Sequence, residues 1–155
     1  MLFIIFGTLL LTGCASSLYG YEPLAGSDVG YYERRMNENY YEVGYQGDKN
    51  TSFETAYDFA ILRALEIGKT LGYEYMLVTS AKDKTKSRSR TGGGGCSPNV
   101  YGQNVCQPVT TYRRTLPGHV ITVEYFESQP KGRFLPENFF LIRSSYIAML
   151  HKYGN

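Results

Sequence analysis

Hydrophobic residues recur at helical spacing over residues 53–71, which is the clearest predicted element of the chain. The predicted apolar face consists of Phe53, Ala56, Tyr57, Ala60, Ile61, Ala64, Leu65, Gly68 and Leu71. Thr51 and Glu54 match a capping box, in which a hydroxyl and a carboxylate satisfy free backbone amides of the first turn. Gly72 follows as the residue that ends the helix in a left-handed conformation. A helix with one long apolar face has to bury it, so a sheet is expected beneath.

Alternating and apolar runs predict strands on both sides of this helix. Residues 40–46 alternate, residues 73–80 are apolar on both faces, and residues 119–126 form a third strand. If the first two strands are parallel, the helix between them is a right-handed crossover. Residues 82–118 then join the second and third strands, most simply as an extended hairpin.

The last fifteen residues predict a short helix beginning at Ser144 or Ser145. Its expected inner side is formed by Tyr146, Ile147, Leu150 and Tyr153. The pattern leaves open whether residues 139–142 belong to this helix or to a fourth strand.

Together these elements predict an α+β fold in the order β-α-β-β-α. A small sheet of three to four strands is packed by one long helix and a short C-terminal helix, with a disulfide-linked hairpin projecting from it. At 155 residues the chain is long enough for one domain with a core and too short for two, so residues 31–155 are assigned to one domain.

The N-terminal residues match a bacterial lipoprotein signal. Residues 2–11 form an apolar run that is too short to span a bilayer, and the run ends in Leu-Thr-Gly-Cys, which matches a lipobox. We therefore expect a signal peptide over residues 1–13 and acylation of the Cys14 thiol; a buried structural cysteine is the alternative. Since no Lys or Arg precedes the apolar run, a start codon further upstream remains open.

The residues after Cys14 predict a tether and a location. Residues 14–30 contain Ser, Gly, Pro and scattered Tyr without periodicity, which is typical of a flexible linker. Ala15 replaces the aspartate that favours inner-membrane retention in enterobacterial sorting. We therefore expect a lipid-anchored protein on the periplasmic face of the outer membrane, although the sequence leaves the inner membrane open.

Two cysteines lie ten residues apart within the predicted hairpin. Cys96 and Cys106 would be exported to an oxidising compartment, so we expect them to form a disulfide. Closing that loop contributes on the order of 2–3 kcal/mol in the chain-entropy model. Two thiols without a nearby histidine make a poor metal site, so no metal is expected. The Gly-rich residues 92–95 lack the Lys-Ser/Thr that follows in a phosphate-binding loop.

A second pattern in the hairpin places cations at every second position. We call this set the basic stripe: Lys82, Lys84, Lys86, Arg88 and Arg90. In an extended chain these five side chains share one face and span roughly 26 Å. Arg113 and Arg114 on the return limb are expected to add to it. Such a stripe favours an anionic partner: phosphorylated lipid headgroups, an anionic glycolipid such as lipopolysaccharide, or an acidic protein surface. The alternative without a binding role is a solvated edge strand whose lysines prevent aggregation.

Composition and the remaining polar residues narrow the functional classes. The formal net charge is only +2, and an exported lipoprotein does not meet nucleic acid. Fifteen tyrosines and no tryptophan suit either an interface or a Tyr-rich core. His119 and His151 lie in no nucleophile or metal motif. We therefore expect no enzyme, no cofactor and no small-molecule substrate.

One part of the chain resembles a family of small, uncharacterised proteobacterial lipoproteins. The residues that carry the resemblance are Gly30-Tyr31-x-Glu33-x-x-Met36-x-x-Asn39-x-Tyr41-x-Val43-x-Tyr45-x-Gly47, Thr51-x-x-Glu54, Leu62-Arg63-Ala64-Leu65-Glu66 and Gly72-Tyr73-x-Tyr75. The chain departs from that pattern at Tyr32, Tyr45 and Leu65, where the family has Ser, Phe and Ala. The resemblance covers residues 30–78 and the lipobox, implies a lipidated envelope protein, and supplies no catalytic residue.

The functional expectation is therefore a non-catalytic interaction or structural module of the cell envelope. Its expected partners are the membrane, through the lipid anchor, and either envelope proteins of an assembly or an anionic glycolipid. An envelope stress sensor with a redox-sensitive Cys96–Cys106 loop is the alternative. A hydrolase would require a nucleophile and a base clustered around His119 or His151.

Overall fold

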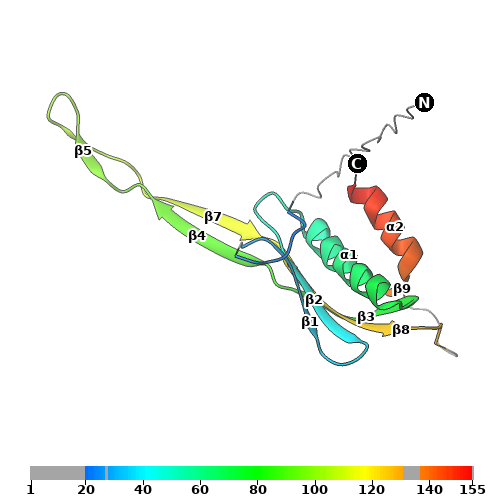
Figure 1. Ribbon diagram of the computed structural model, residues 1–155. Helices are drawn as coiled ribbons and strands as arrows, with labels where there is room; N and C mark the ends of the chain where they lie inside the picture. Colours follow the sequence, from blue (N-terminus) through cyan, green and yellow to red (C-terminus); the bar gives the residue numbers. More distant parts are fainter. Residues whose placement is uncertain (1–19, 27, 131–136, 155) are drawn as a thin grey trace, which may run out of the picture.

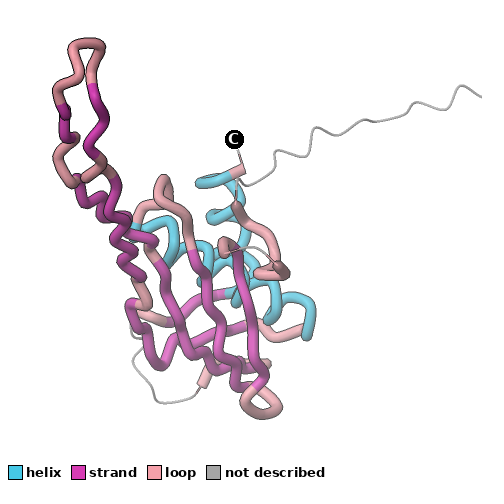
Figure 2. Tube along the Cα trace, turned by 90° about the vertical axis from the view of Figure 1, so that its left-hand side faces the viewer, coloured by secondary structure: helices cyan, strands magenta, loops and turns pink. Residues whose placement is uncertain are grey.

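The computed structural model describes residues 20–26, 28–130 and 137–154. Within these residues the elements are β1(Gly30–Arg35), β2(Tyr40–Gln46), α1(Phe53–Leu71), β3(Tyr75–Asp83), β4(Lys86–Gly92), β5(Cys96–Pro98), β6(Asn104–Cys106), β7(Thr110–Leu116), β8(Gly118–Phe126), β9(Phe139–Leu141) and α2(Ile142–Tyr153). The α+β prediction is confirmed. Both helices lie on one side of the sheet, and a long hairpin projects away from it (Figures 1 and 2).

The central sheet has the strand order β1-β2-β8-β3-β9, and each neighbouring pair is antiparallel. Because β2 and β3 both pair with β8, they run parallel to each other on its two sides. Helix α1 therefore crosses over β8, and the two strands it connects are not neighbours. The sheet has five strands rather than the expected three to four, because β1 and β9 add an edge on each side.

The start of α1 differs from the predicted capping box. Ser52 is the N-cap, and its hydroxyl accepts a hydrogen bond from the Thr55 amide at 3.0 Å. The Thr51 hydroxyl donates instead to the Asp48 carboxylate at 2.8 Å, which lowers the pKa of Asp48. The predicted end of the helix is confirmed, since Gly72 has φ 83° and donates its amide to the last turn.

The buried face of α1 is wider than the predicted stripe. Phe59, Leu62 and Ile67 are buried, whereas the terminal residues Phe53 and Leu71 are about half exposed. The Phe59 ring contacts tyrosines from the N-terminal segment, from β2 and from α2, at centroid distances of 5.0–5.3 Å. The helix is therefore covered by the N-terminal segment and α2 as well as by the sheet. A single periodic stripe predicts burial against the sheet alone.

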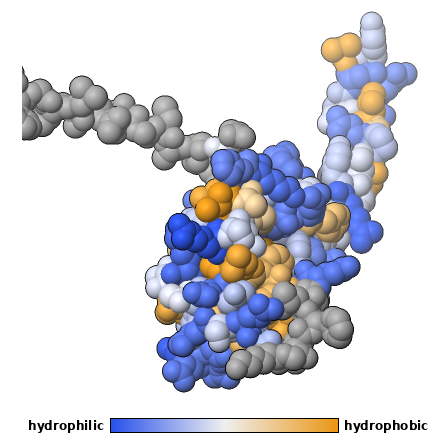
Figure 3. All heavy atoms as spheres, turned by 90° about the vertical axis from the view of Figure 1, so that its right-hand side faces the viewer, coloured by the Kyte–Doolittle hydropathy of each residue, from blue (hydrophilic) through white to orange (hydrophobic). Residues whose placement is uncertain are grey.

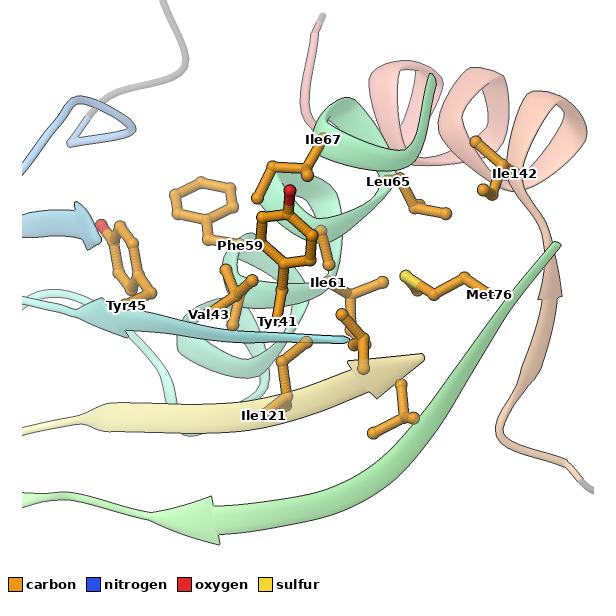
Figure 4. Packing of buried hydrophobic residues seen from close by; sticks show 14 of the residues in the cluster. Tyr41, Val43, Tyr45, Phe59, Ile61, Leu65, Ile67, Met76, Ile121 and Ile142 are labelled. Carbon is orange, nitrogen blue, oxygen red and sulfur yellow. The ribbon is translucent and has the colours of Figure 1, made fainter. Parts of the chain in front are cut away.

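Much of the tyrosine content belongs to this core, which Figure 4 shows between α1 and the sheet. Tyr41, Tyr45 and Tyr125 are buried. The Tyr125 hydroxyl donates to the Ala64 carbonyl at 2.6 Å, and its burial raises the pKa of Tyr125. Tyrosine fits here because the ring fills the apolar layer while the hydroxyl finds a backbone partner.

The N-terminal segment packs on the body sooner than expected. The Tyr21 hydroxyl donates to the Glu66 carboxylate at 2.7 Å, and its ring lies against Phe59 and Tyr31. Pro23 forms an isolated parallel bridge with Tyr31. The expected tether over residues 14–30 therefore does not extend to Gly30, because the chain is already fixed at Tyr21. Residues 14–19 lie outside the described residues.

The C-terminal residues resolve the alternative that the sequence left open. Phe139–Leu141 is an edge strand paired with β3, and α2 begins directly at Ile142, which is buried. Ile147 and Leu150, expected on the inner side of this helix, are 48% and 37% exposed. The inner side is formed instead by Ile142, Tyr146, Met149 and Tyr153, which recur at helical spacing and leave Ile147 and Leu150 on the outer side.

Gly68 provides a test of how tightly the two helices pack. A Cβ at this position would lie 2.6 Å from Ile142 Cδ1 and 2.8 Å from Tyr125 Cε1. Ala is usually the better helix former, but here its methyl group overfills the interface, so Gly68→Ala should lower the free energy of unfolding by about 1–3 kcal/mol. Urea denaturation measures this change. Thr70→Ala, at an exposed position of α1, is the matched control and should stay within about 0.5 kcal/mol of the wild type. Equal effects would mean that the interface accommodates the methyl group.

Candidate functional site

Residues 84–116, which we call the arm, leave the sheet as an extended two-stranded hairpin (Figures 1 and 2). The arm begins where β3 and β8 run past the rest of the sheet, and the Lys84 amide donates to the Gly118 carbonyl at 2.8 Å. The β4–β7 ladder forms its proximal part and the β5–β6 ladder its distal part. The predicted hairpin is therefore confirmed, and its side chains lie almost entirely outside the core.

The predicted disulfide is confirmed near the end of the arm. Cys96 and Cys106 are directly opposed in the β5–β6 ladder and joined at an S–S distance of 1.98 Å. All six residues of these two short strands are exposed. The disulfide thus cross-links a ladder that has no apolar layer of its own to hold it together.

The arm is strongly positive, whereas the rest of the chain is negative. Six of the sixteen basic residues and none of the fourteen acidic residues lie within residues 84–116. The arm therefore carries a formal charge of +6, and the remaining residues carry −4 to give the net +2. The near-neutral total conceals a segregation of charge between a cationic arm and an acidic body.

The strand register divides the proximal arm into two different faces. Directly opposed residues share a face, and the pairs Lys86–Leu116, Arg88–Arg114 and Arg90–Tyr112 alternate with pairs on the other side. We call the first set the cationic face. The opposite face carries mainly hydroxyl groups, contributed by Ser87, Ser89, Thr91, Thr111 and Thr115.

The register also separates two arginines that the sequence placed together. Arg114 is opposite Arg88 and joins the cationic face, as expected. Arg113 is opposite Ser89 and lies on the hydroxyl face, so it does not add to the stripe. Adjacent residues in a strand point to opposite faces, so only one of two neighbouring arginines joins a given stripe.

The cationic face contains a shallow hollow lined by Arg90, Gly92, Tyr112 and Arg114. Gly92 has no side chain to cover the Tyr112 ring, and Tyr112 is 61% exposed. Arg88 and Arg114 are like charges placed directly across the ladder, an arrangement that is unfavourable without a counter-ion. The acidic partner within the described residues is Asp28, at 3.5 Å from Arg88 and itself 76% exposed.

The stripe continues onto the body at the base of the arm. Lys82 pairs with Val120, whose side chain points away from the helices. Lys84 and Lys86 line one cleft together with Tyr32 and Val120. The helix-free side of the sheet and the cationic face of the arm therefore meet along the row of lysines.

The two histidines lie apart and form no cluster. The His119 ring packs against Tyr57 at 5.5 Å, with its Nδ1 buried and without a hydrogen bond to the described residues, whereas His151 is exposed on α2. Asp83 pairs with His119 across the ladder, and the pKa of this carboxyl is lowered by the hydrogen bond from Thr85. Among residues 20–26, 28–130 and 137–154, no group of three or more His, Cys, Asp or Glu is arranged to hold a metal ion.

Comparisons with protein-family models, with curated proteins and with solved structures find no match for this chain. The predicted acylation site, Cys14, lies outside the described residues. Within the described parts of the chain, no helix is long and apolar enough to cross a membrane.

The sequence did not indicate two features of the candidate site: the uncharged end of the arm and Tyr112. Val100 and Tyr101 at the apex are 93% and 85% exposed. Tyr112 is placed on the cationic face only by the register. The available signal was the alternation over Thr110–Leu116, which puts Tyr112, Arg114 and Leu116 on one face.

Because the arm lies outside the core, its disulfide should contribute little to the stability of the body. In a Cys96→Ser, Cys106→Ser double variant we expect the thermal unfolding midpoint to change by less than about 2 °C. Amide hydrogen exchange in β5 and β6 should accelerate markedly, because the cross-link holds only this local ladder. A large shift of the midpoint would instead show that arm and body unfold as one unit.

Proposed function

We propose that this protein is a non-catalytic interaction module of the bacterial cell envelope. In this proposal Cys14 carries the lipid anchor, the folded body faces the periplasm from the outer membrane, and the arm engages an anionic partner. The partner is either an anionic glycolipid or a subunit of an envelope assembly.

The charge and exposure of the arm carry this proposal. An exposed hairpin of formal charge +6 buries almost no side chain and places Arg88 opposite Arg114. Such an arrangement repels itself, so it is favoured by an anionic surface that neutralises the cations. An edge strand that only prevents aggregation needs exposed charges, but these charges need not share one face. In the β4–β7 ladder all but one of the arginines do share a face.

The body supports the same interpretation as a rigid platform. Its sheet and helices enclose a continuous core, and β3 and β8 extend directly into the base of the arm. The body thereby fixes the direction of the arm relative to the sheet. A defined orientation lowers the conformational cost of docking.

Charge reversal tests the proposal. In Lys84→Glu, Lys86→Glu, Arg88→Glu, three attractions to an anionic partner become repulsions, so recovery of envelope partners should fall at least tenfold. The measurement is a mild-detergent pull-down of the lipidated protein, with quantitative mass spectrometry of the bound proteins and lipids. Lys49→Glu, Lys69→Glu, Arg143→Glu changes the same total charge on the body and should leave recovery nearly unchanged. Undiminished recovery by the arm variant would contradict the proposal.

A second candidate is an envelope stress sensor, favoured by the exposure of both disulfide residues. In that case loss of the cross-link changes the contact between the arm and its partner. A Cys96→Ser, Cys106→Ser strain should then activate an envelope stress reporter without added stress. A silent reporter in a strain that exports the variant normally would argue against this function.

A further inference from the structure

We propose that the arm binds the surface of an anionic phospholipid bilayer, with Arg88, Arg90 and Arg114 contacting lipid phosphates and the apex entering the interfacial region. This inference rests on the proposed function and changes its partner: the arm contacts the phosphates of phospholipids rather than a glycolipid or an assembly subunit. It is carried by three features: the one-sided arginines, the open shape of their surface, and the uncharged apex.

The three arginines match the chemistry of phosphate groups. A guanidinium presents a planar set of donors that binds two phosphate oxygens at once. Arg88 and Arg114 are cross-strand neighbours, and Arg90 is the next residue along the same face. Side chains in these positions emanate from points roughly 5–7 Å apart, so one or two phosphates fit between them. Such a phosphate would neutralise the repulsion between Arg88 and Arg114, which the exposed Asp28 compensates only in part.

The openness of this surface favours an array of phosphates over a single dissolved anion. The Arg88 side chain is 62% exposed, and the hollow beside Tyr112 is open to solvent. An exposed cation near an anionic membrane contributes about 1 kcal/mol, which is too little to retain a free phosphate. Several such contacts act together only when the phosphates are presented on one surface. The lysines that continue the stripe at the base extend the row further.

The apex supplies the second feature expected of a membrane-binding hairpin. Residues 91–112 contain no charged side chain. Val100 and Tyr101 are almost fully exposed, and Val105 and Val109 are 55% and 64% exposed. Tyrosine is enriched at the level of lipid headgroups because its ring is apolar and its hydroxyl is polar. Figure 3 shows apolar residues on the projecting arm, set among hydrophilic ones.

These features fit a bilayer better than an acidic protein. A protein interface normally requires a shaped apolar centre surrounded by polar residues, whereas the arm offers an open row of cations followed by an uncharged end. A peripheral membrane contact requires cations at the headgroups and apolar residues in the interfacial layer, and an arm that lies along the bilayer presents both to the same surface. The disulfide cross-links the β5–β6 ladder, which lies between the cationic face and the apex.

The test compares two adjacent arginines with the same charge and opposite orientation. The mature chain carrying Cys14→Ser keeps every helix and strand but cannot be acylated. Its binding is measured by flotation with vesicles of phosphatidylcholine, with or without phosphatidylglycerol. We expect binding only to vesicles that contain phosphatidylglycerol, and weaker binding as the salt concentration rises. Arg114→Glu should weaken the affinity by about tenfold or more, and Arg113→Glu by less than about threefold.

A second variant tests the apex separately. Val100→Ser, Tyr101→Ser leaves the charge unchanged and should also weaken the affinity by about tenfold, because it removes the apolar contribution. Equal losses of affinity in Arg113→Glu and Arg114→Glu would contradict binding through the cationic face and would show that only net charge matters.

Inhibition of vesicle binding by micromolar inorganic phosphate would contradict bilayer binding and would indicate a discrete anion site. Thermal unfolding confirms that each variant retains the folded body.

The outcome also separates this inference from the proposed function. If the protein does not bind vesicles but charge reversal of the arm still abolishes recovery of an envelope protein, bilayer binding is wrong and the proposed interaction module is supported. If the protein does not bind vesicles and recovery is unchanged, both proposals are wrong.

Discussion

The burial of α1 on the β2-β8-β3 sheet is the interaction on which the rest of the structure depends. Nine residues of this helix are buried, and the Tyr125 hydroxyl ties the central strand to the helix backbone. Burying one of the Phe, Ile or Leu side chains among them contributes about 1.5–3 kcal/mol, so this layer dominates the stability of the body. The N-terminal segment, β1 and α2 then pack around the same helix rather than forming a second core.

This arrangement also explains how the arm can remain free of the core. Since β3 and β8 are neighbours at the centre of the sheet, their extension leaves the body as a ready-made two-stranded ladder. Its backbone groups are paired within the ladder, so its side chains need not be buried. The arm is then held by backbone hydrogen bonds and one disulfide, and its surface is available for an anionic partner.

Charged residues are also arranged differently in the body and in the arm. The body uses ion pairs that cross between elements, such as Arg63 with Glu33 at 2.8 Å and Lys152 with Asp58 at 2.6 Å. The arm has almost no such pairing, because its own residues include no acid. Exposed pairs contribute little to stability, so folding does not require the segregation; in the proposed function it serves binding.

The sequence alone determined the α+β class, the presence of the long helix and its glycine end, and the disulfide hairpin. These features have local causes: periodic burial, a left-handed glycine, and an even pair of cysteines. Only the tertiary structure decided that β8 lies between the parallel strands and that β1 and β9 extend the sheet. It also separated Arg113 from Arg114 and placed Tyr112 on the cationic face. The physical reason is that register and neighbour choice depend on contacts between residues far apart in the chain, which local periodicity does not encode.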